Sequence, residues 1–148
     1  MPQYARPVAD LVKGNWEDNA NSSANIYQAI DESALSTADW ARSTAAPSND
    51  DFVVQLTSTI QDPLSSAGHI LRYTIKKDSS GGAQIDAEVK LCINFVSTGS
   101  PGTVISSYSH TNLSASAWSS QAQTLSAAQA DAITAYSSMA LWFRANQV

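Results

Sequence analysis

Two runs in which apolar and polar residues alternate constrain the fold of this chain most strongly. The first run covers residues 69–77, with apolar positions Leu71, Tyr73 and Ile75. The second covers residues 85–95, with apolar positions Ile85, Ala87, Val89, Leu91, Ile93 and Phe95. Because successive side chains of a strand point to opposite faces, each run predicts a strand with one buried and one solvated face. The intervening Ser79-Ser80-Gly81-Gly82 predicts a turn that joins the two strands as an antiparallel hairpin.

Shorter apolar segments, separated by turn-forming residues, predict further strands. Phe52, Val54 and Leu56 share one face of a strand, and a loop is expected at residues 62–68, which contain Pro63 and Gly68. Other expected strands lie at 26–30, 39–43, 104–110 and 118–125. About eight short strands, evenly separated by turns, predict an all-β fold, an antiparallel, jelly-roll-like β-sandwich.

The C-terminal region predicts a short helix followed by a last strand. Ser126 is expected to be the N-cap of a helix over residues 127–134, with Gln129 at the capping-box position. Residues 139–145 follow as an apolar strand, which we expect to pair inside a sheet because unpaired termini fray. Its alternation leaves Trp142 and Arg144 on the side opposite Leu141. Tryptophan and arginine are enriched at protein interfaces, so this outward pair indicates a contact surface. The alternative is that Trp142 packs under the N-terminal segment.

The chain has the size of one domain. Its 148 residues can bury a core without disulfide or metal staples. Pro2 and Pro7 favour extended geometry, so residues 1–23 are expected to form an N-terminal arm and residues 24–148 the sandwich domain. The arm would cross its own domain or reach onto a neighbour.

Charge excludes some partners and favours others. The net charge is −5, and Lys76-Lys77 is the only adjacent basic pair, so nucleic-acid binding is not expected. Only 14% of the residues are charged, and a surface rich in hydroxyl groups costs less free energy to desolvate when subunits meet than a charged one.

No apolar run is long enough for a membrane helix, and the first residues lack a secretory signal pattern. Synthesis and assembly in a cytoplasm are therefore expected.

The residues that could take part in catalysis or metal binding do not form a catalytic motif. His69 and His110 lack metal-binding spacing, and no serine stands in a hydrolase motif, so we predict no enzyme activity and assign no catalytic residue, metal or cofactor. The doublets Asp31-Glu32 and Asp50-Asp51 are predicted to be solvated turn carboxylates, with a calcium site as the alternative. Cys92 is interpreted as a small filler rather than a reactive thiol. The four tryptophans could stack on sugars or fill a core: Trp16, Trp40, Trp118 and Trp142.

Several segments resemble small β-sandwich proteins and tail-appended domains that tailed bacteriophages and prophages encode. The resembling stretches are Arg6-Pro7 with Asp10 and Trp16, then residues 26–32, 39–43, 62–63, 68–73 and 125–133, leading to 141–143. The resemblance implies a virion structural role, such as a capsid decoration protein or a head or tail surface protein. It implies location on the virion and carries no catalytic residue.

The resulting functional hypothesis is a non-enzymatic structural protein that binds the particle lattice and its own copies. The expected partner is the major capsid protein or another virion protein, and we expect a homo-oligomer, for which a trimer is one form. The interface residues predicted from the sequence are Tyr4, Arg6, Arg72, Lys76, Glu88, Trp142 and Arg144. The alternatives are a carbohydrate-binding module on a phage tail or fibre and, less favoured, a sandwich-fold glycan hydrolase.

Overall fold

Antiparallel strands make up most of the computed structural model, which describes residues 2–79 and 82–148. The described residues contain nine strands, one α-helix and two 3₁₀ turns. The strands are β1 (Pro7–Val12), β2 (Glu17–Asp18), β3 (Ala41–Arg42), β4 (Asp50–Leu56), β5 (Ile70–Ile75), β6 (Ile85–Ile93), β7 (Thr103–His110), β8 (Ser119–Thr124) and β9 (Met139–Gln147). The helical elements are η1 (Ile26–Ala29), α1 (Ala127–Asp131) and η2 (Tyr136–Ser138). The prediction of a mainly β, antiparallel fold is confirmed.

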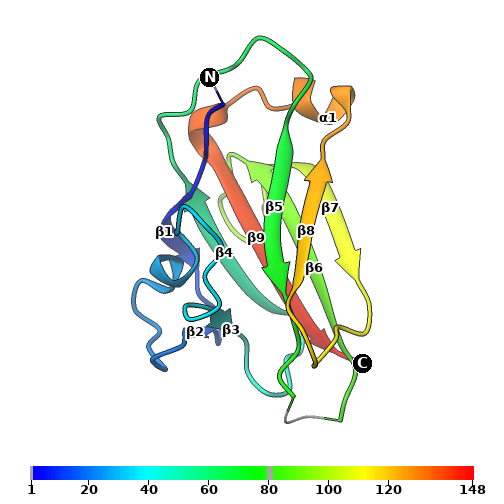
Figure 1. The fold of residues 1–148 in the computed structure, drawn as a ribbon. Coiled ribbons are helices and arrows are strands. Elements are labelled where there is room, and N and C mark those ends of the chain that lie inside the picture. The colour runs from blue at the N-terminus through cyan, green and yellow to red at the C-terminus, as the bar shows by residue number, and fades with distance from the viewer. Residues whose placement is uncertain (1, 80–81) are drawn as a thin grey trace.

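The largest unit is a five-stranded antiparallel sheet with strand order β1-β4-β9-β6-β7. The C-terminal strand β9 lies in its middle, between β4 and β6 (Figure 1). Its pairing with β6 runs without interruption from Met139, opposite Ile93, to Gln147, opposite Ile85. The expectation that the last strand pairs inside a sheet is therefore confirmed.

A two-stranded ribbon of β5 and β8 lies over one face of this sheet (Figure 1). The main core fills the space between them, because the inward side chains of both units belong to one apolar cluster. Its members include Phe52, Val54, Leu71, Tyr73, Val89, Leu91, Ile105 and Leu141. The opposite face of the sheet, turned away from the ribbon, is called the outer face below.

The predicted hairpin between residues 69–77 and 85–95 is wrong. β5 pairs with β8, whereas β6 pairs with β7 on one side and β9 on the other. The alternation holds within β5 and β6, but both apolar faces point into the same core from opposite layers. Since β6 already has a neighbour on each side, it has no free edge for β5. Of the turn predicted at residues 79–82, positions 80 and 81 lie outside the described residues.

The strand predicted at residues 26–30 is also wrong, because this segment forms the 3₁₀ turn η1. Asn25 before it has a left-handed backbone with φ of 56°. The carboxylate of Asp10 on β1 then accepts hydrogen bonds from the amides of Ile26, at 2.8 Å, and Tyr27, at 2.7 Å. A side chain sixteen residues away therefore satisfies amides that a strand would have paired in a sheet.

Substitution of Asp10 with alanine is expected to lower the free energy of unfolding by about 1–2 kcal/mol, because two amides lose a charged acceptor. Chemical denaturation measures the change. Asp10→Asn keeps one acceptor oxygen and should recover part of the loss. An unchanged stability for Asp10→Ala would show that the cap does not stabilise this turn.

Two other local predictions have different outcomes. The capping box at Ser126 and Gln129 is confirmed, with Ser126 Oγ accepting from the Gln129 amide at 3.2 Å and Gln129 Oε1 accepting from the Ser126 amide at 2.9 Å. The helix it starts is shorter than predicted and ends at Asp131. Phe95 does not share the inner face of β6: Asn94 has φ of 56°, which ends the alternation and turns Phe95 toward Trp142 on the outer face.

Residues 2–12 lie against their own chain. The side chain of Gln3 donates to the Gln61 carbonyl and accepts from the Gln61 amide, both at 2.9 Å. The Arg6 guanidinium donates to backbone carbonyls of Glu32 and Ser33. β1 then forms an edge of the main sheet beside β4. The sequence left open whether this segment crosses its own domain or reaches onto a neighbour, and residues 2–12 pack on their own chain.

Candidate functional site

The outer face of the five-stranded sheet gathers ionic and aromatic side chains from three neighbouring strands. The register places Arg144 on β9 between Asp51 on β4 and Glu88 on β6. One step further along, Trp142 on β9 lies opposite Lys90 on β6. Residues directly opposite each other on antiparallel strands share a face, so these five side chains form one group. We call Asp51, Glu88, Lys90, Trp142 and Arg144 the outer-face network.

Asp51 holds two members of the network in place. Its Oδ1 accepts from the Trp142 indole Nε1 and from Arg144 Nε, both at 2.7 Å. Its Oδ2 accepts from Arg144 Nη2 at 3.0 Å, which completes a bidentate pair. The hydrogen bond that Arg144 donates to Asp51 raises the pKa of Arg144 further above its ordinary value. The side chains of Arg144 and Asp51 keep 29% and 15% exposure, so the pair is partly shielded from water.

Trp142 lies on the predicted side of β9, but its ring is covered. The residue is only 4% exposed, because Lys90 Nζ lies 4.3 Å and Arg144 Cζ 4.9 Å from the ring centroid. Phe95 contacts the ring edge-on at 6.1 Å between centroids. Beneath it lie the buried side chains of Val53, Cys92 and Ala140. The expectation that Trp142 itself presents an outward aromatic surface is corrected: the surface here consists of its two cations.

Glu88 completes the network at the side of β7. Its Oε2 lies 2.8 Å from Lys90 Nζ, and its Oε1 accepts from Ser107 Oγ at 2.6 Å. Burial alone would raise the pKa of Glu88, but the hydrogen bonds from Lys90 and Ser107 outweigh it and lower the pKa. Glu88 therefore remains ionised at neutral pH, and the face presents fixed charges of both signs.

Cys92 lies under Trp142 as a fully buried free thiol. Its interpretation as a filler agrees with this burial. Burial raises the thiol pKa to about 11, although nearby Lys90 acts in the opposite direction. Since the thiolate is the nucleophile, a buried neutral thiol is poorly reactive.

A thiol reagent such as Ellman's reagent should therefore leave Cys92 unmodified in the folded protein at pH 8 and modify it fully in denaturant. Absorbance of the released thiolate measures the reaction. Rapid modification of the folded protein would contradict the burial of this side chain under Trp142.

The other residues predicted for an interface lie elsewhere. Tyr4 is exposed on the N-terminal segment, with Arg6 Cζ 5.5 Å from its ring centroid. Arg72 is exposed on β5, and Lys76 follows that strand with its Nζ 5.1 Å from the ring centroid of Trp118. The structure thus brings together Glu88, Trp142 and Arg144 and leaves the remaining four outside that group.

Two members of the network, Asp51 and Lys90, were not predicted. The Asp50-Asp51 doublet was interpreted as solvated, but both residues belong to β4, and Asp50 is buried with its Oδ1 accepting from the Asn15 amide at 3.0 Å. As expected for neighbours on a strand, the two carboxylates point to opposite faces. Lys90 lies on the same polar side of the alternating run as Glu88, and this position could have indicated from the sequence that the two residues share a face. The contact with Trp142 depends on the register between β6 and β9.

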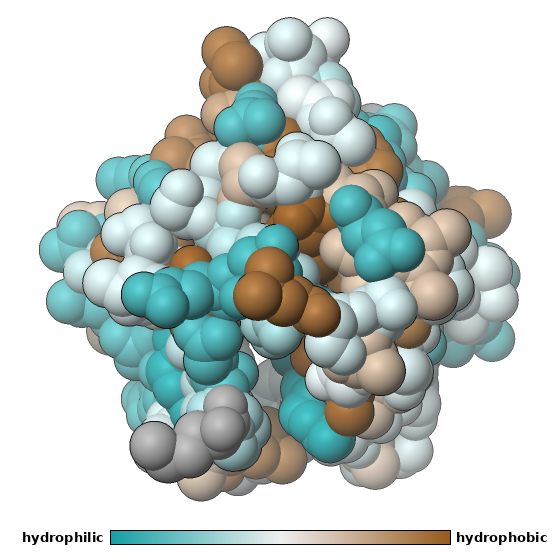
Figure 2. Space-filling view, turned by 90° about the horizontal axis from the view of Figure 1, so that it is seen from above, coloured by the Kyte–Doolittle hydropathy of each residue, from teal (hydrophilic) through white to brown (hydrophobic). Residues whose placement is uncertain are grey.

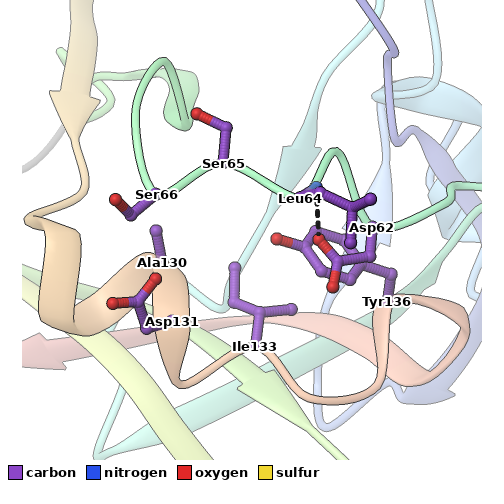
Figure 3. A pocket seen from close by; sticks show the side chains of 8 residues that line it. All are labelled: Asp62, Leu64, Ser65, Ser66, Ala130, Asp131, Ile133 and Tyr136. Atoms are coloured by element: carbon purple, nitrogen blue, oxygen red, sulfur yellow. Dashed lines mark hydrogen bonds between the residues drawn. The ribbon is translucent and has the colours of Figure 1, made fainter.

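A hollow of about 340 Å³ lies at the end of the molecule that carries α1 (Figure 3). Ala130, Ile133 and Tyr136 line it together with the loop that contains Leu64, and carboxylates Asp62 and Asp131 border it. We call it the acidic hollow. Burial, then the charges of Asp62 and Asp131, raise the pKa of Tyr136. Seen from this end, hydrophilic and apolar residues are intermixed on the surface (Figure 2).

The two histidines each pair with a tyrosine. His69 Nε2 lies 2.7 Å from the Tyr136 hydroxyl, and His110 Nε2 lies 2.7 Å from the Tyr73 hydroxyl. Within residues 2–79 and 82–148, no three histidine, cysteine, aspartate or glutamate side chains gather as a metal site.

A second hollow, of about 390 Å³, adjoins the outer-face network between Asp86, Glu88, His110 and Arg144.

Comparisons with protein-family models, curated proteins and solved structures give no match for this chain. None of the helices among the described residues has the length and apolar character needed to cross a membrane.

Proposed function

We propose that this protein is a non-enzymatic structural component of a bacteriophage virion, a capsid decoration protein that binds the particle lattice and its own copies. In this proposal the ribbon and the five-stranded sheet form an open, jelly-roll-like β-sandwich. The major capsid protein or another virion protein is the partner, and assembly takes place in the host cytoplasm. The resemblance of several sequence segments to phage-encoded sandwich proteins supports this assignment.

The observation that carries the proposal is the fixed geometry of the outer-face network. Asp51 holds both Trp142 and Arg144, and Glu88 holds Lys90, through contacts of 2.7–3.0 Å. Side chains already fixed before contact lose little conformational entropy on binding. Charges of both signs in fixed positions give specificity for a surface with the complementary pattern. A lattice offers that surface many times, so modest individual contacts suffice for retention.

The same geometry favours protein contact over sugar stacking. Stacking on a sugar needs an open aromatic face, whereas Lys90 and Arg144 lie over the Trp142 ring. Arg42 lies over Trp40 and Lys76 over Trp118, with 5.3 Å and 5.1 Å to the ring centroids. Trp16 stacks on Phe52 in the core at 5.5 Å. Three of the four tryptophans thus lie under cations, which suit a polar protein surface.

Mass spectrometry of gradient-purified particles from the source culture tests the assignment. The chain is expected in the particle fraction, in a fixed ratio to the major capsid protein across the peak. Its complete absence from particles, while it is present in the lysate, would refute a virion role. Glycan-array binding that is lost on tryptophan-to-alanine substitution would replace the proposal with the carbohydrate-binding alternative.

A further inference from the structure

The free edge of β8 differs from the other sheet edges of the molecule. Residues 119–124 of β8 contain only serine, glutamine, alanine and threonine, with neither charge nor proline. The strand pairs with β5 in six consecutive positions without a bulge. Among the described residues nothing pairs with its other side. An edge that is regular, uncharged and open is a template for another strand, because its outward amides and carbonyls lack partners.

The edges β1, β7 and β5 carry features that oppose strand addition, and β2 and β3, with two residues each, are too short to template another strand. β1 begins at Pro7, contains Asp10 and has two irregularities in its register. β7 has a bulge opposite Leu91 and Cys92. β5 carries the exposed Arg72 at its middle, so a second β5 would place like charges side by side. Strand addition is therefore most favourable at β8.

We infer that two copies of this chain associate through β8, antiparallel about a two-fold axis, and join their ribbons into one four-stranded layer. Two copies that each carry a net charge of −5 repel one another, and an uncharged strand adds no further repulsion where they meet. In an isologous contact the same patch serves both copies, so no second surface is required. This contact is separate from the outer-face network, and its failure leaves the proposed function intact.

Charge complementarity supports a second copy as the occupant. β5 ends at the end of the molecule remote from α1 (Figure 1), where Lys76 and Lys77 outnumber Asp78. The opposite end of the ribbon carries the acidic hollow with Asp62 and Asp131, neither of which forms an ion pair within the described residues. An antiparallel pairing of β8 with its copy places the basic end of each ribbon beside the acidic end of the other.

The first variant tests the strand edge itself. Ala122 is exposed at the middle of β8, opposite Arg72 of β5. In Ala122→Glu the new carboxylate faces Arg72 within its own ribbon, so the monomer should remain folded, whereas the two copies bring their carboxylates together. Sedimentation equilibrium from micromolar to millimolar concentration should show a dimer for the wild type and an increase of about tenfold or more in Kd for Ala122→Glu.

Thr44→Glu, which adds the same charge in an exposed loop, is the matched control and should dimerise like the wild type. The charge arrangement is tested separately: Lys76→Glu should weaken the dimer, and adding Asp131→Lys in the same chain should restore it. A wild type that stays monomeric at millimolar concentration would overturn the inference. A dimer that Ala122→Glu and Thr44→Glu affect equally would also overturn it, because the contact would then lie elsewhere.

Discussion

Phe52→Ala is expected to lower the free energy of unfolding by about 4 kcal/mol, the largest loss among the substitutions considered. Phe52 is 1% exposed on β4, and its ring stacks on Trp16 at 5.5 Å and on Phe143 at 6.0 Å between centroids. Removal of a buried aromatic ring leaves a cavity and costs about 3–5 kcal/mol. The ring also packs Trp16 of the N-terminal region against the sheet, so the N-terminal region and the sheet both lose packing.

Guanidinium denaturation followed by circular dichroism measures this loss. Val104→Ala on β7 is the control, since Val104 is 42% exposed and should cost well under about 1 kcal/mol. Equal stabilities for the two variants would show that Phe52 does not occupy the centre of the core.

Asp51→Ala is expected to lower the free energy of unfolding by about 2–3 kcal/mol. The substitution leaves the Trp142 indole N–H and the Arg144 guanidinium without their acceptor, and a buried donor without a partner is costly. The fraction of the total tryptophan fluorescence that an added quencher reaches should also increase, because the Trp142 ring, one of four in the chain, loses the bond that fixes it.

The matched control is Glu17→Ala, which breaks another carboxylate–arginine pair. Arg42 and Glu17 are 42% and 35% exposed, so that pair is worth about 1 kcal/mol or less. Denaturation curves of the two variants separate the effects. If Asp51→Ala cost no more than Glu17→Ala, the outer-face network would not be a rigid unit.

The sequence predicted individual strands well because alternation is a local signal. The inward faces of β4, β5 and β6 follow directly from the spacing of residues such as Val54, Tyr73 and Val89. The Ser126–Gln129 capping box is equally local and was also predicted. Each of these features depends on residues a few positions apart.

Strand pairing was not predictable in the same way. β5 and β6 are adjacent in sequence and both alternate, yet they do not pair with each other: β5 pairs with β8, and β6 pairs with β7 and β9. The 3₁₀ turn at Ile26 depends on Asp10, and the covered ring of Trp142 depends on Lys90. Long-range register decides such contacts, and alternation alone carries no information about it.

The candidate site shows the same division. Alternation correctly placed Trp142 and Arg144 on one face and Glu88 on the polar side of β6. The sequence could not show that these residues meet, that Asp51 joins them, or that Tyr4 and Arg6 lie elsewhere. The site therefore follows from the tertiary pairing of β4, β9 and β6.

The most direct test of the outer face as the lattice-binding surface is co-sedimentation with particles assembled without this gene. The double variant Glu88→Lys with Lys90→Glu keeps the ion pair and the net charge but reverses the charge pattern on the face. The matched control exchanges Glu17 and Arg42 in the same way (E17R with R42E) on β2 and β3. The wild type and the control should co-sediment, and the face variant should bind about tenfold more weakly or worse. Equal binding of all three proteins, or binding by none, would contradict the account.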